Sequence, residues 1–293
     1  MEPIPFDKRS GKIWFNGKLI NWPDVKIHIL SHGLHYASCV FEGERVYDGE
    51  IFRLEEHTER LFHSASRMGF SIPYSQKSLN KSCKDIVEVQ KVKNGYVRPV
   101  VWRGSEMMAI SAQKTKIHVA IATWEWGSYF DPNLKLKGIK LNISKWKRPA
   151  PDTIPWDTKA SGLYMICTLS KHEAEKEGFT DSLMLDYQGN VAEATGANIF
   201  FKNNDNELHT PIPDSFLNGI TRRCVIEIAK LKNIKVIERK IKPEELSKFT
   251  GCFLTGTAAE VTPVSQIEKY NFKVCSVIKD LSKSYQELVR KKL

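Results

Sequence analysis

The chain has 293 residues, of which 41% are hydrophobic and 27% are charged, a composition ordinary for a soluble globular protein. Its length exceeds one average domain, so two α/β domains or one large domain are expected. No apolar stretch is long enough to span a bilayer, and the first 17 residues lack the apolar core of a signal peptide. The six cysteines form no C-x-x-C pair, which favours a reducing cytoplasm and argues against a zinc site.

The formal net charge of +10 invites the hypothesis of a basic nucleic-acid-binding protein without catalysis. Lysine and arginine are spread along the whole chain, however, and are interleaved with acids, as in K-H-E-A-E-K-E at residues 171–177. A basic arm or stripe would be needed to bind a phosphate backbone. We therefore favour a soluble enzyme whose charge helps to attract anionic substrates, and we expect no nucleic-acid and no membrane partner.

The first 120 residues mix antiparallel strands with two helices. The predicted elements are hairpins over residues 13–19 and 46–52, helices over 54–68 and 76–92, and strands over 96–102 and 116–123. Asn16-Gly17 suits a tight hairpin turn, whereas Gly69 and Asn94-Gly95 are typical of the ends of helices.

The second half continues this mixture. A turn-rich passage over residues 126–137 is the best candidate for a linker between domains 1–125 and 138–293. The predicted elements after it are a strand over residues 140–144, a helix over 162–177, a hairpin over 182–201, a helix over 220–231 and a buried strand over 252–254. The order is too irregular for a doubly wound sheet, so we expect an α/β fold of the α+β type.

Three histidines, His28, His32 and His35, stand close enough in sequence to suggest a metal site. Their segment alternates like a strand and turn and contains no carboxylate. We therefore interpret them as structural or as neighbours of an active site, and we expect no metal. Nucleotide-binding, esterase and zincin motifs do not occur in the sequence.

Lys159 stands after a loop that contains Pro149, Pro151 and Pro155, and small residues follow it. A lysine that forms a Schiff base must be held still and partly desolvated, so that its amine loses a proton and attacks an aldehyde. Small neighbours leave room for a planar ring. Because the chain has 44 lysines and arginines, an exposed loop lysine is the ordinary interpretation, and other motifs must decide.

Six motifs accompany Lys159, in order, along nearly the whole chain. They lie at residues 31–43, 56–61, 95–99, 190–198, 216–222 and 255–263. Together they closely resemble the branched-chain amino acid aminotransferases, class IV enzymes of fold type IV that use pyridoxal 5'-phosphate (PLP). The resemblance implies a two-domain fold, with a small N-terminal α/β domain and a larger PLP-binding domain that has a pseudo-barrel core. It also implies that Lys159 carries the cofactor.

The resemblance assigns further residues to the cofactor. Glu193 would keep the pyridine nitrogen protonated, so that the ring withdraws electrons when the substrate Cα loses its proton. Tyr164 would hydrogen-bond the phenolic oxygen of the ring. The phosphate would lie at the positive end of the helix that opens at residues 219–221. The phosphate site would include Arg60, Gly219, Ile220, Thr221 and Thr257, and Leu217 would also belong to the cofactor site.

The resemblance also describes the substrate site. Tyr96 and the amides of Thr257 and Ala258 would hold the α-carboxylate, with Arg98 beside them. Tyr96 and Arg98 are two residues apart on a predicted strand and therefore share one face. The apolar pocket would be lined by Phe41, Gly43, Trp126 and Tyr129, with Tyr36 from a second subunit.

The implied reaction is reversible transfer of an amino group between leucine, isoleucine or valine and 2-oxoglutarate, in a homo-oligomer of at least two chains. D-amino acid aminotransferases and aminodeoxychorismate lyases share the fold and are the nearest alternatives. Tyr96-x-Arg98 together with G-T-A-A at residues 256–259 favours the branched-chain group. The sequence departs from the family at Ala37 and Glu44, where glycine and isoleucine are common, and over residues 103–114, which lack the expected glycines. These departures bear on substrate range rather than on the cofactor.

Overall fold

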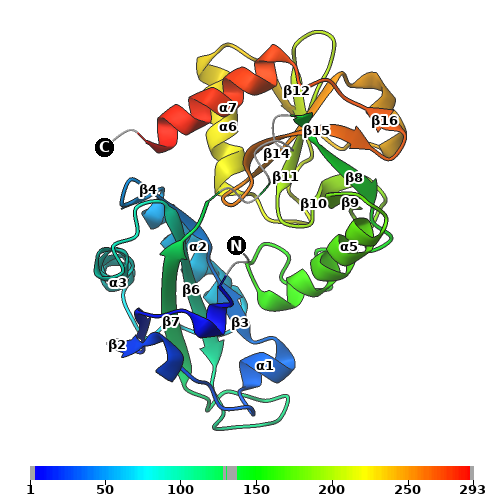
Figure 1. Ribbon diagram of the computed structural model, residues 1–293. Helices are drawn as coiled ribbons and strands as arrows, with labels where there is room; N and C mark the ends of the chain where they lie inside the picture. Colours follow the sequence, from blue (N-terminus) through cyan, green and yellow to red (C-terminus); the bar gives the residue numbers. More distant parts are fainter. Residues whose placement is uncertain (1–3, 128–129, 131–136, 291–293) are drawn as a thin grey trace. The chain divides into compact units, whose positions relative to one another are not determined.

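The computed structural model describes residues 4–127, 130 and 137–290. The chain forms two compact units, drawn in Figure 1. Unit 1 contains Met1–Gly127 and Thr158–Gly162, and unit 2 contains Ser128–Asp157 and Leu163–Leu293. Five residues around Lys159 are thus part of the N-terminal unit, an excursion that no sequence pattern indicates. The domain limits expected from the sequence, including the linker over residues 126–137, stay a prediction.

Unit 1 is built on a seven-stranded sheet whose strand pairs are antiparallel. The strands lie in the order β2-β1-β7-β6-β4-β5, and β3 pairs with β6. Their bounds are β1 Lys12–Phe15, β2 Lys18–Asn21, β3 Cys39–Phe41, β4 Glu44–Tyr47, β5 Glu50–Ile51, β6 Gly95–Arg103 and β7 Ile117–Glu125. The helices are α1 His32–Tyr36, α2 Leu54–Arg67 and α3 Gln76–Val89, with 3-10 turns at Phe6–Lys8 and Trp22–Asp24.

The turn residues explain both hairpins of unit 1. Asn16 and Gly17 have φ values of 48° and 89°, and Asp48 and Gly49 have 52° and 90°. Two successive positive φ values are those of a type I′ turn, which matches the twist of the flanking strands. The two predicted hairpins are therefore confirmed.

The end predicted for the helix over residues 76–92 is wrong. Helix α3 ends at Val89, and Lys91 takes the left-handed conformation with φ 55°. The amides of Lys91 and Val92 then bond to the carbonyls of Glu88 and Val87, which is the Schellman pattern. Since Val92 is buried, packing ends the helix before Asn94-Gly95 is reached.

The described part of unit 2 is built on a nine-stranded sheet, and six of its strands close into a ring. The ring runs β10-β9-β8-β15-β14-β11 and returns to β10, and β12, β13 and β16 extend it. Strand β8 is parallel to both of its neighbours, and the other neighbours in the ring are antiparallel. The bounds are β8 Ile139–Ile143, β9 Asp181–Leu185, β10 Val191–Ala194, β11 Asn198–Lys202, β12 Leu208–Thr210, β13 Val236–Glu238, β14 Gly251–Gly256, β15 Glu260–Ile267 and β16 Tyr270–Asn271. The expected barrel-like core is confirmed.

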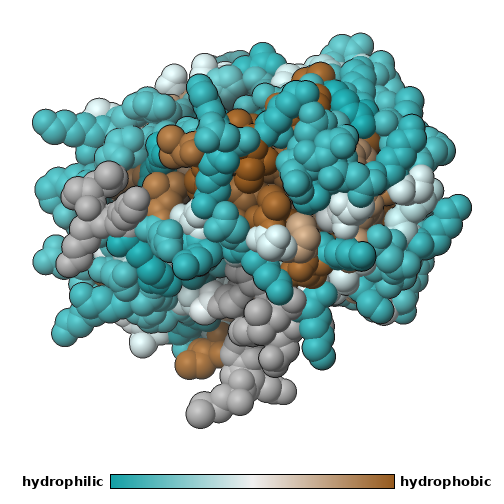
Figure 2. Space-filling view, turned by 90° about the horizontal axis from the view of Figure 1, so that it is seen from above, coloured by the Kyte–Doolittle hydropathy of each residue, from teal (hydrophilic) through white to brown (hydrophobic). Residues whose placement is uncertain are grey.

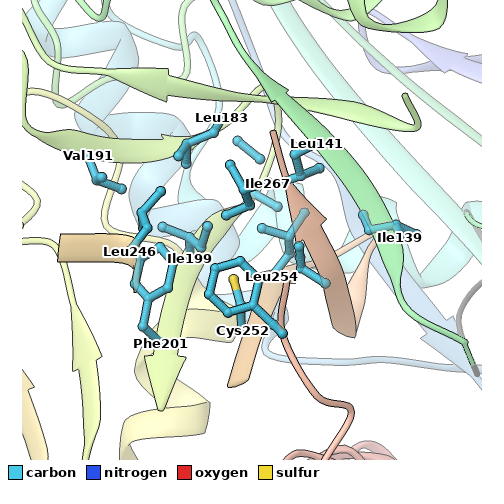
Figure 3. Close-up of a cluster of buried hydrophobic side chains, with 14 of the residues drawn as sticks. Ile139, Leu141, Leu183, Val191, Ile199, Phe201, Leu246, Cys252, Leu254 and Ile267 are labelled. Atoms are coloured by element: carbon cyan, nitrogen blue, oxygen red, sulfur yellow. The ribbon is translucent and has the colours of Figure 1, made fainter. Parts of the chain in front are cut away.

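Apolar side chains from the ring strands pack together in the core of unit 2 (Figure 3). Leu141, Leu183, Ile199, Leu254 and Ile267 come from five different strands and are completely buried. Burial of each such side chain stabilises the fold by about 1.5–3 kcal/mol. The ring is therefore a packed core, and it fixes the strand ends from which the candidate site residues project.

The predicted hairpin over residues 182–201 is wrong in one respect. Its second arm is two strands, β10 and β11, that pair with each other through Glu193 and Asn198. The Ala194 amide donates to the Ala197 carbonyl at 2.8 Å, so the chain reverses between them. This tight reversal places Glu193 and Asn198 opposite each other.

The helices whose bounds the described part of unit 2 gives are α5 Met165–Lys176, α6 Ile220–Leu231 and α7 Ser276–Val289. Helix α6 has the predicted bounds, whereas the helix predicted over residues 162–177 begins as a 3-10 turn, Ser161–Tyr164. Helix α7 has no counterpart among the predicted elements, and a second 3-10 segment is Pro243–Lys248. Among the described residues no helix has the length and apolarity that crossing a membrane demands. Hydrophilic residues cover most of the face shown in Figure 2, with hydrophobic residues among them in the middle of the view.

Candidate active site

The backbone of Lys159 is held at both of its polar groups by residues of unit 1. Its amide donates to Ser64 Oγ at 3.0 Å, and its carbonyl accepts from the Phe41 amide at 3.1 Å. The next residue, Ala160, forms an antiparallel bridge with Val40. The ammonium nitrogen lies 5.2 Å from the centre of the Phe41 ring. Lys159 is thus a lysine with a fixed backbone beside an aromatic face, unlike an ordinary loop lysine.

A buried carboxylate holds Arg60. Glu42 is completely buried, and its two oxygens accept from Arg60 Nε at 2.7 Å and Nη2 at 2.9 Å. His57 Nδ1 lies 2.7 Å from the same carboxylate. Burial alone would raise the pKa of Glu42, but Arg60 and His57 outweigh it and hold that pKa far below its usual range. The two-point contact fixes the guanidinium plane and leaves Arg60 only partly exposed.

The residues predicted for the substrate pocket of unit 1 form one connected cluster. Tyr96 and Arg98 lie on the same face of β6, and the Arg98 guanidinium is 5.3 Å from the Tyr96 ring and 4.7 Å from the Phe41 ring. Trp126 meets Tyr96 edge-on at 4.7 Å. Gly43 lies so close to Tyr96 that a Cβ on it would be 1.9 Å from the hydroxyl oxygen. This position of the Tyr96 ring therefore requires glycine at residue 43, and the reason is a close contact rather than a turn.

Two predicted pocket residues stand apart from this cluster. Tyr36 is 42% exposed, and its ring stacks on that of His32, a residue outside this cluster, with the ring centroids 4.6 Å apart. Tyr129 lies outside the described residues. Their roles stay predictions.

The three histidines of the N-terminal segment have structural contacts. His32 opens helix α1, is buried, and bonds to Ser38 Oγ and the Ala109 carbonyl through its two ring nitrogens. The segment is therefore partly helical, and its expected strand-and-turn character is wrong there. Within residues 4–127, 130 and 137–290, no group of three or more His, Cys, Asp or Glu side chains is placed to hold a metal ion.

In unit 2 the side chain of Glu193 is buried next to a cation. Arg148 Nε lies 3.4 Å from one carboxylate oxygen, and Asn198 Nδ2 donates to the other at 3.3 Å. Arg148 is itself buried, and its Nη1 donates to the Leu163 carbonyl. Glu193 is therefore held in one orientation as an acceptor, with one edge facing Arg148.

The amino end of α6 is organised by Asn198. Its side chain donates to the Leu217 carbonyl at 2.9 Å and accepts from the Gly219 amide at 3.0 Å. Gly219 is the N-cap and has no side chain that could occupy the first-turn amides of Ile220 and Thr221. A Cβ on Gly219 would lie 2.4 Å from Asn198 Oδ1, so this arrangement requires glycine. First-turn amides at the positive end of a twelve-residue helix are suited to bind an anion.

The turn after β14 belongs to the same part of unit 2. Thr255 pairs with Asn198 across the strands, and the position of a Cβ on Gly256 would be 3.3 Å from the Gly196 carbonyl. Thr257 and Ala258 follow in that turn and are half-buried. Tyr164, also half-buried, ends the 3-10 turn that precedes α5. Asn198 thus links three parts of unit 2: Glu193, the amino end of α6, and the end of β14 that leads into the turn with Thr257.

Sequence reasoning missed several residues that organise these groups. Glu42, His57 and Asn198 lie inside the resemblance motifs. Considering every residue of each motif as a candidate would have found them. Ser64 and Arg148 lie outside the motifs, and no local pattern marks them. Glu44, noted as a departure, is completely buried, and both its carboxyl oxygens lack a hydrogen-bond partner among the described residues.

Comparison with known proteins agrees with this geometry. The Amino-transferase class IV family matches residues 39–267. A relative from Rickettsia felis, named probable branched-chain-amino-acid aminotransferase, is 41% identical over 99% of this chain and 100% of its own. The Escherichia coli branched-chain amino acid aminotransferase structure has a TM-score of 0.91 at 34% identity, covering 96% of this chain and 95% of its own. The T.th. branched-chain amino acid aminotransferase, complexed with N-(5'-phosphopyridoxyl)-L-glutamate, also gives 0.91 at 34% identity, with 96% and 94% covered. The expected fold type IV is confirmed, and the chain belongs to the class IV aminotransferases.

Proposed function

We propose that this chain is a PLP-dependent branched-chain amino acid aminotransferase, which exchanges an amino group between leucine, isoleucine or valine and 2-oxoglutarate, with glutamate as the product of the second half-reaction. The observation that carries the proposal is Lys159, the lysine to which the resemblance assigns the cofactor, whose backbone is fixed on both sides. The names of the relatives and the phosphopyridoxyl-glutamate complex of the T.th. enzyme support the cofactor and the substrate class.

The donor set fits PLP. Class IV aminotransferases use this cofactor, which carries an anionic phosphate, a pyridine nitrogen and an aldehyde. Arg60, the amides of Ile220 and Thr221, and Thr257 are cationic or neutral donors of the kind that bind phosphate. Glu193 is a buried acceptor suited to a protonated ring nitrogen, and Tyr164 carries a hydroxyl for the phenolic oxygen. When bound, PLP supplies an electron sink for the substrate Cα.

The protein residues then orient groups and move protons. We propose that Lys159 Nζ takes the proton from Cα of the donor amino acid. In the second half-reaction it gives a proton to Cα of the amino acid that forms. The Phe41 ring beside Nζ shields the amine from water. Glu193, held by Asn198 and Arg148, keeps the ring nitrogen protonated through a fixed carboxylate.

Substrate recognition is proposed from the cluster in unit 1. Phe41 and Trp126 offer apolar and aromatic surface, and burial of a leucine side chain stabilises binding by about 1.5–3 kcal/mol. Arg98 is the cation of this cluster and is proposed to meet the second carboxylate of glutamate or 2-oxoglutarate. The backbone amides of Thr257 and Ala258 in unit 2, with the Tyr96 hydroxyl, are proposed to hold the α-carboxylate.

We also propose that the enzyme is cytoplasmic and a homo-oligomer. All six cysteines are free thiols, in keeping with a reducing compartment. Ile29, Leu34 and Tyr36 expose 69%, 57% and 42% of their surface, an apolar group that supports contact with a second copy near Tyr36.

Borohydride reduction of the PLP-loaded protein, followed by peptide mass mapping, tests the assignment. The pyridoxyl label should be found on Lys159, and Lys159→Ala should lose both the label and transamination of leucine. Lys147→Ala, which removes an exposed lysine from the same segment, is the matched control and should keep both. A label on any other lysine would refute the assignment.

A further inference from the structure

Helix α2 presents one face that carries three polar side chains. Arg60 and Ser64 follow His57 by three and seven residues, so all three lie on the same side of the helix. His57 and Arg60 both contact the carboxylate of Glu42. Ser64 is completely buried and bonds instead to the backbone amide of Lys159.

The contact with Ser64 spans 95 residues of sequence. A buried serine in a helix ordinarily satisfies its hydroxyl by donating to the carbonyl four residues earlier. Here the oxygen serves as an acceptor for an amide that lies outside the helix. Because an amide withdrawn from water is destabilised when it lacks a partner, the Ser64 hydroxyl is the group that satisfies the part-buried amide of Lys159. Ser64 therefore determines where the backbone of Lys159 lies.

We propose that Ser64 is a positioning residue for the reaction: it anchors the backbone of Lys159 to the turn of α2 that also carries Arg60. The inference rests on the proposed function, in which Arg60 meets the phosphate and Lys159 Nζ moves the proton. Arg60 and Ser64 are four residues apart, about 6 Å along the helix axis. One rigid turn thus sets the distance between the phosphate donor and the lysine backbone.

The second anchor makes the arrangement stiff. The Phe41 amide donates to the Lys159 carbonyl, and Phe41 is followed directly by Glu42, which holds Arg60. The lysine, the arginine and the serine are therefore tied into one closed set of contacts within unit 1. With the backbone fixed on both sides, only the side chain of Lys159 has to move during the proton transfer. A fixed backbone reduces the number of unproductive positions of Nζ, which raises the rate of the chemical step.

The test compares Ser64→Ala with Ser82→Ala, which removes a buried hydroxyl from α3 of the same unit. Alanine suits a helix interior, so both variants should fold. Amide hydrogen exchange, resolved to residue 159 in the protein without PLP, should be at least tenfold faster in Ser64→Ala than in wild type and unchanged in Ser82→Ala. In the loaded enzyme, kcat for leucine should fall about tenfold in Ser64→Ala with KM changed less than threefold. The PLP-loaded enzyme changes its visible absorbance with pH. The midpoint of this change should move in Ser64→Ala and stay at the wild-type pH in Ser82→Ala.

Equal exchange at residue 159 in wild type and Ser64→Ala would overturn the proposal. So would exchange in wild type at the rate of an unstructured amide, a result that does not depend on any variant. An exchange effect without a change in kcat or in the absorbance midpoint would show that the bond is structural, and it would also overturn the positioning role. Failure of the proposed function is distinguished by the borohydride label, because a wild-type label away from Lys159 leaves the exchange result intact.

Discussion

Replacement of Glu44 by isoleucine should stabilise the folded protein, and the gain should grow with pH. Glu44 lies in β4, its side chain is completely buried, and neither carboxyl oxygen has a hydrogen-bond partner within the described part of the chain. Burial, reinforced by the charge of Glu42, raises the pKa of Glu44 well above its usual range, and Arg60 and Arg98 offset this only in part. Folding therefore favours the protonated, neutral form of this carboxyl group.

The magnitude follows from the two unpaired oxygens. A buried polar group without a partner costs about 1–3 kcal/mol, and an apolar side chain in its place removes that cost. We expect Glu44→Ile to raise the free energy of unfolding by about 2 kcal/mol, which for a chain of this size raises Tm by roughly 3 °C.

The sign of the pH dependence follows from proton linkage. The folded-state pKa of Glu44 is raised above the unfolded value of about 4.3. Between these two values the folded state binds a proton that the unfolded state has released, so stability falls as pH rises. The fall is as much as about 1.4 kcal/mol per pH unit for one proton. Glu44→Ile abolishes this fall, so its advantage over wild type should be larger at pH 8 than at pH 5.

Urea unfolding and thermal unfolding at pH 5, 6.5 and 8, with and without added PLP, measure both effects. Glu44→Gln keeps the size and polarity of the side chain but cannot ionise, so it should reproduce the pH-dependent part of the gain only. Glu42→Gln is the opposite control: it breaks a paired buried carboxylate and should destabilise by about 3 kcal/mol or more. Two results would refute the claim that Glu44 is an unpaired buried carboxyl group with a raised pKa. One is that Glu44→Ile is no more stable than wild type at pH 8, and the other is that its gain is the same at pH 5 and pH 8.

Two further predictions concern the reaction. Glu193→Gln should retain the PLP label on Lys159 but slow single-turnover reaction with leucine on the order of a hundredfold, since a charge-assisted contact of ~2–3 kcal/mol is lost; rates within a few-fold of wild type would show that Glu193 does not face the ring nitrogen. Arg98→Met should harm the glutamate and 2-oxoglutarate half-reaction more than the leucine half-reaction, because glutamate brings a second carboxylate that needs a cation. Equal losses in the two half-reactions would assign Arg98 to the α-carboxylate. No loss in either would show that Arg98 has no part in substrate binding.

Local signals in the sequence predicted the parts of the fold that depend on local physics. Asn16-Gly17 forced a primed turn because both residues adopt positive φ, and helix α6 could be bounded because its apolar residues repeat with helical spacing. The missed β15 contains Pro263, a residue that argues against a strand, although it pairs there with Phe253. The missed α7 begins at Ser276 without a side-chain cap.

Contacts between distant residues left no local signal. The bond between Ser64 and Lys159 and the one between Phe41 and Lys159 place the catalytic candidate in unit 1, although the residues on both sides of it belong to unit 2. Arg148 beside Glu193 is likewise a contact that spacing does not encode. The family resemblance located the candidate residues, but only the folded chain shows which neighbours hold them.

The residues of the motif at 56–61 serve different structural purposes. Glu56 pairs with Arg53 at the surface, and Leu61 is completely buried in the core, so these letters serve the helix and its packing. His57 and Arg60 instead face Glu42, a residue of the preceding motif. The two motifs are therefore one structural group: Glu42 fixes Arg60 while its neighbour, Phe41, fixes the backbone of Lys159. Phe41 and Glu42 are adjacent, and one holds the Lys159 backbone while the other holds Arg60. Displacement of β3 relative to α2 would therefore disturb the phosphate donor and the lysine together.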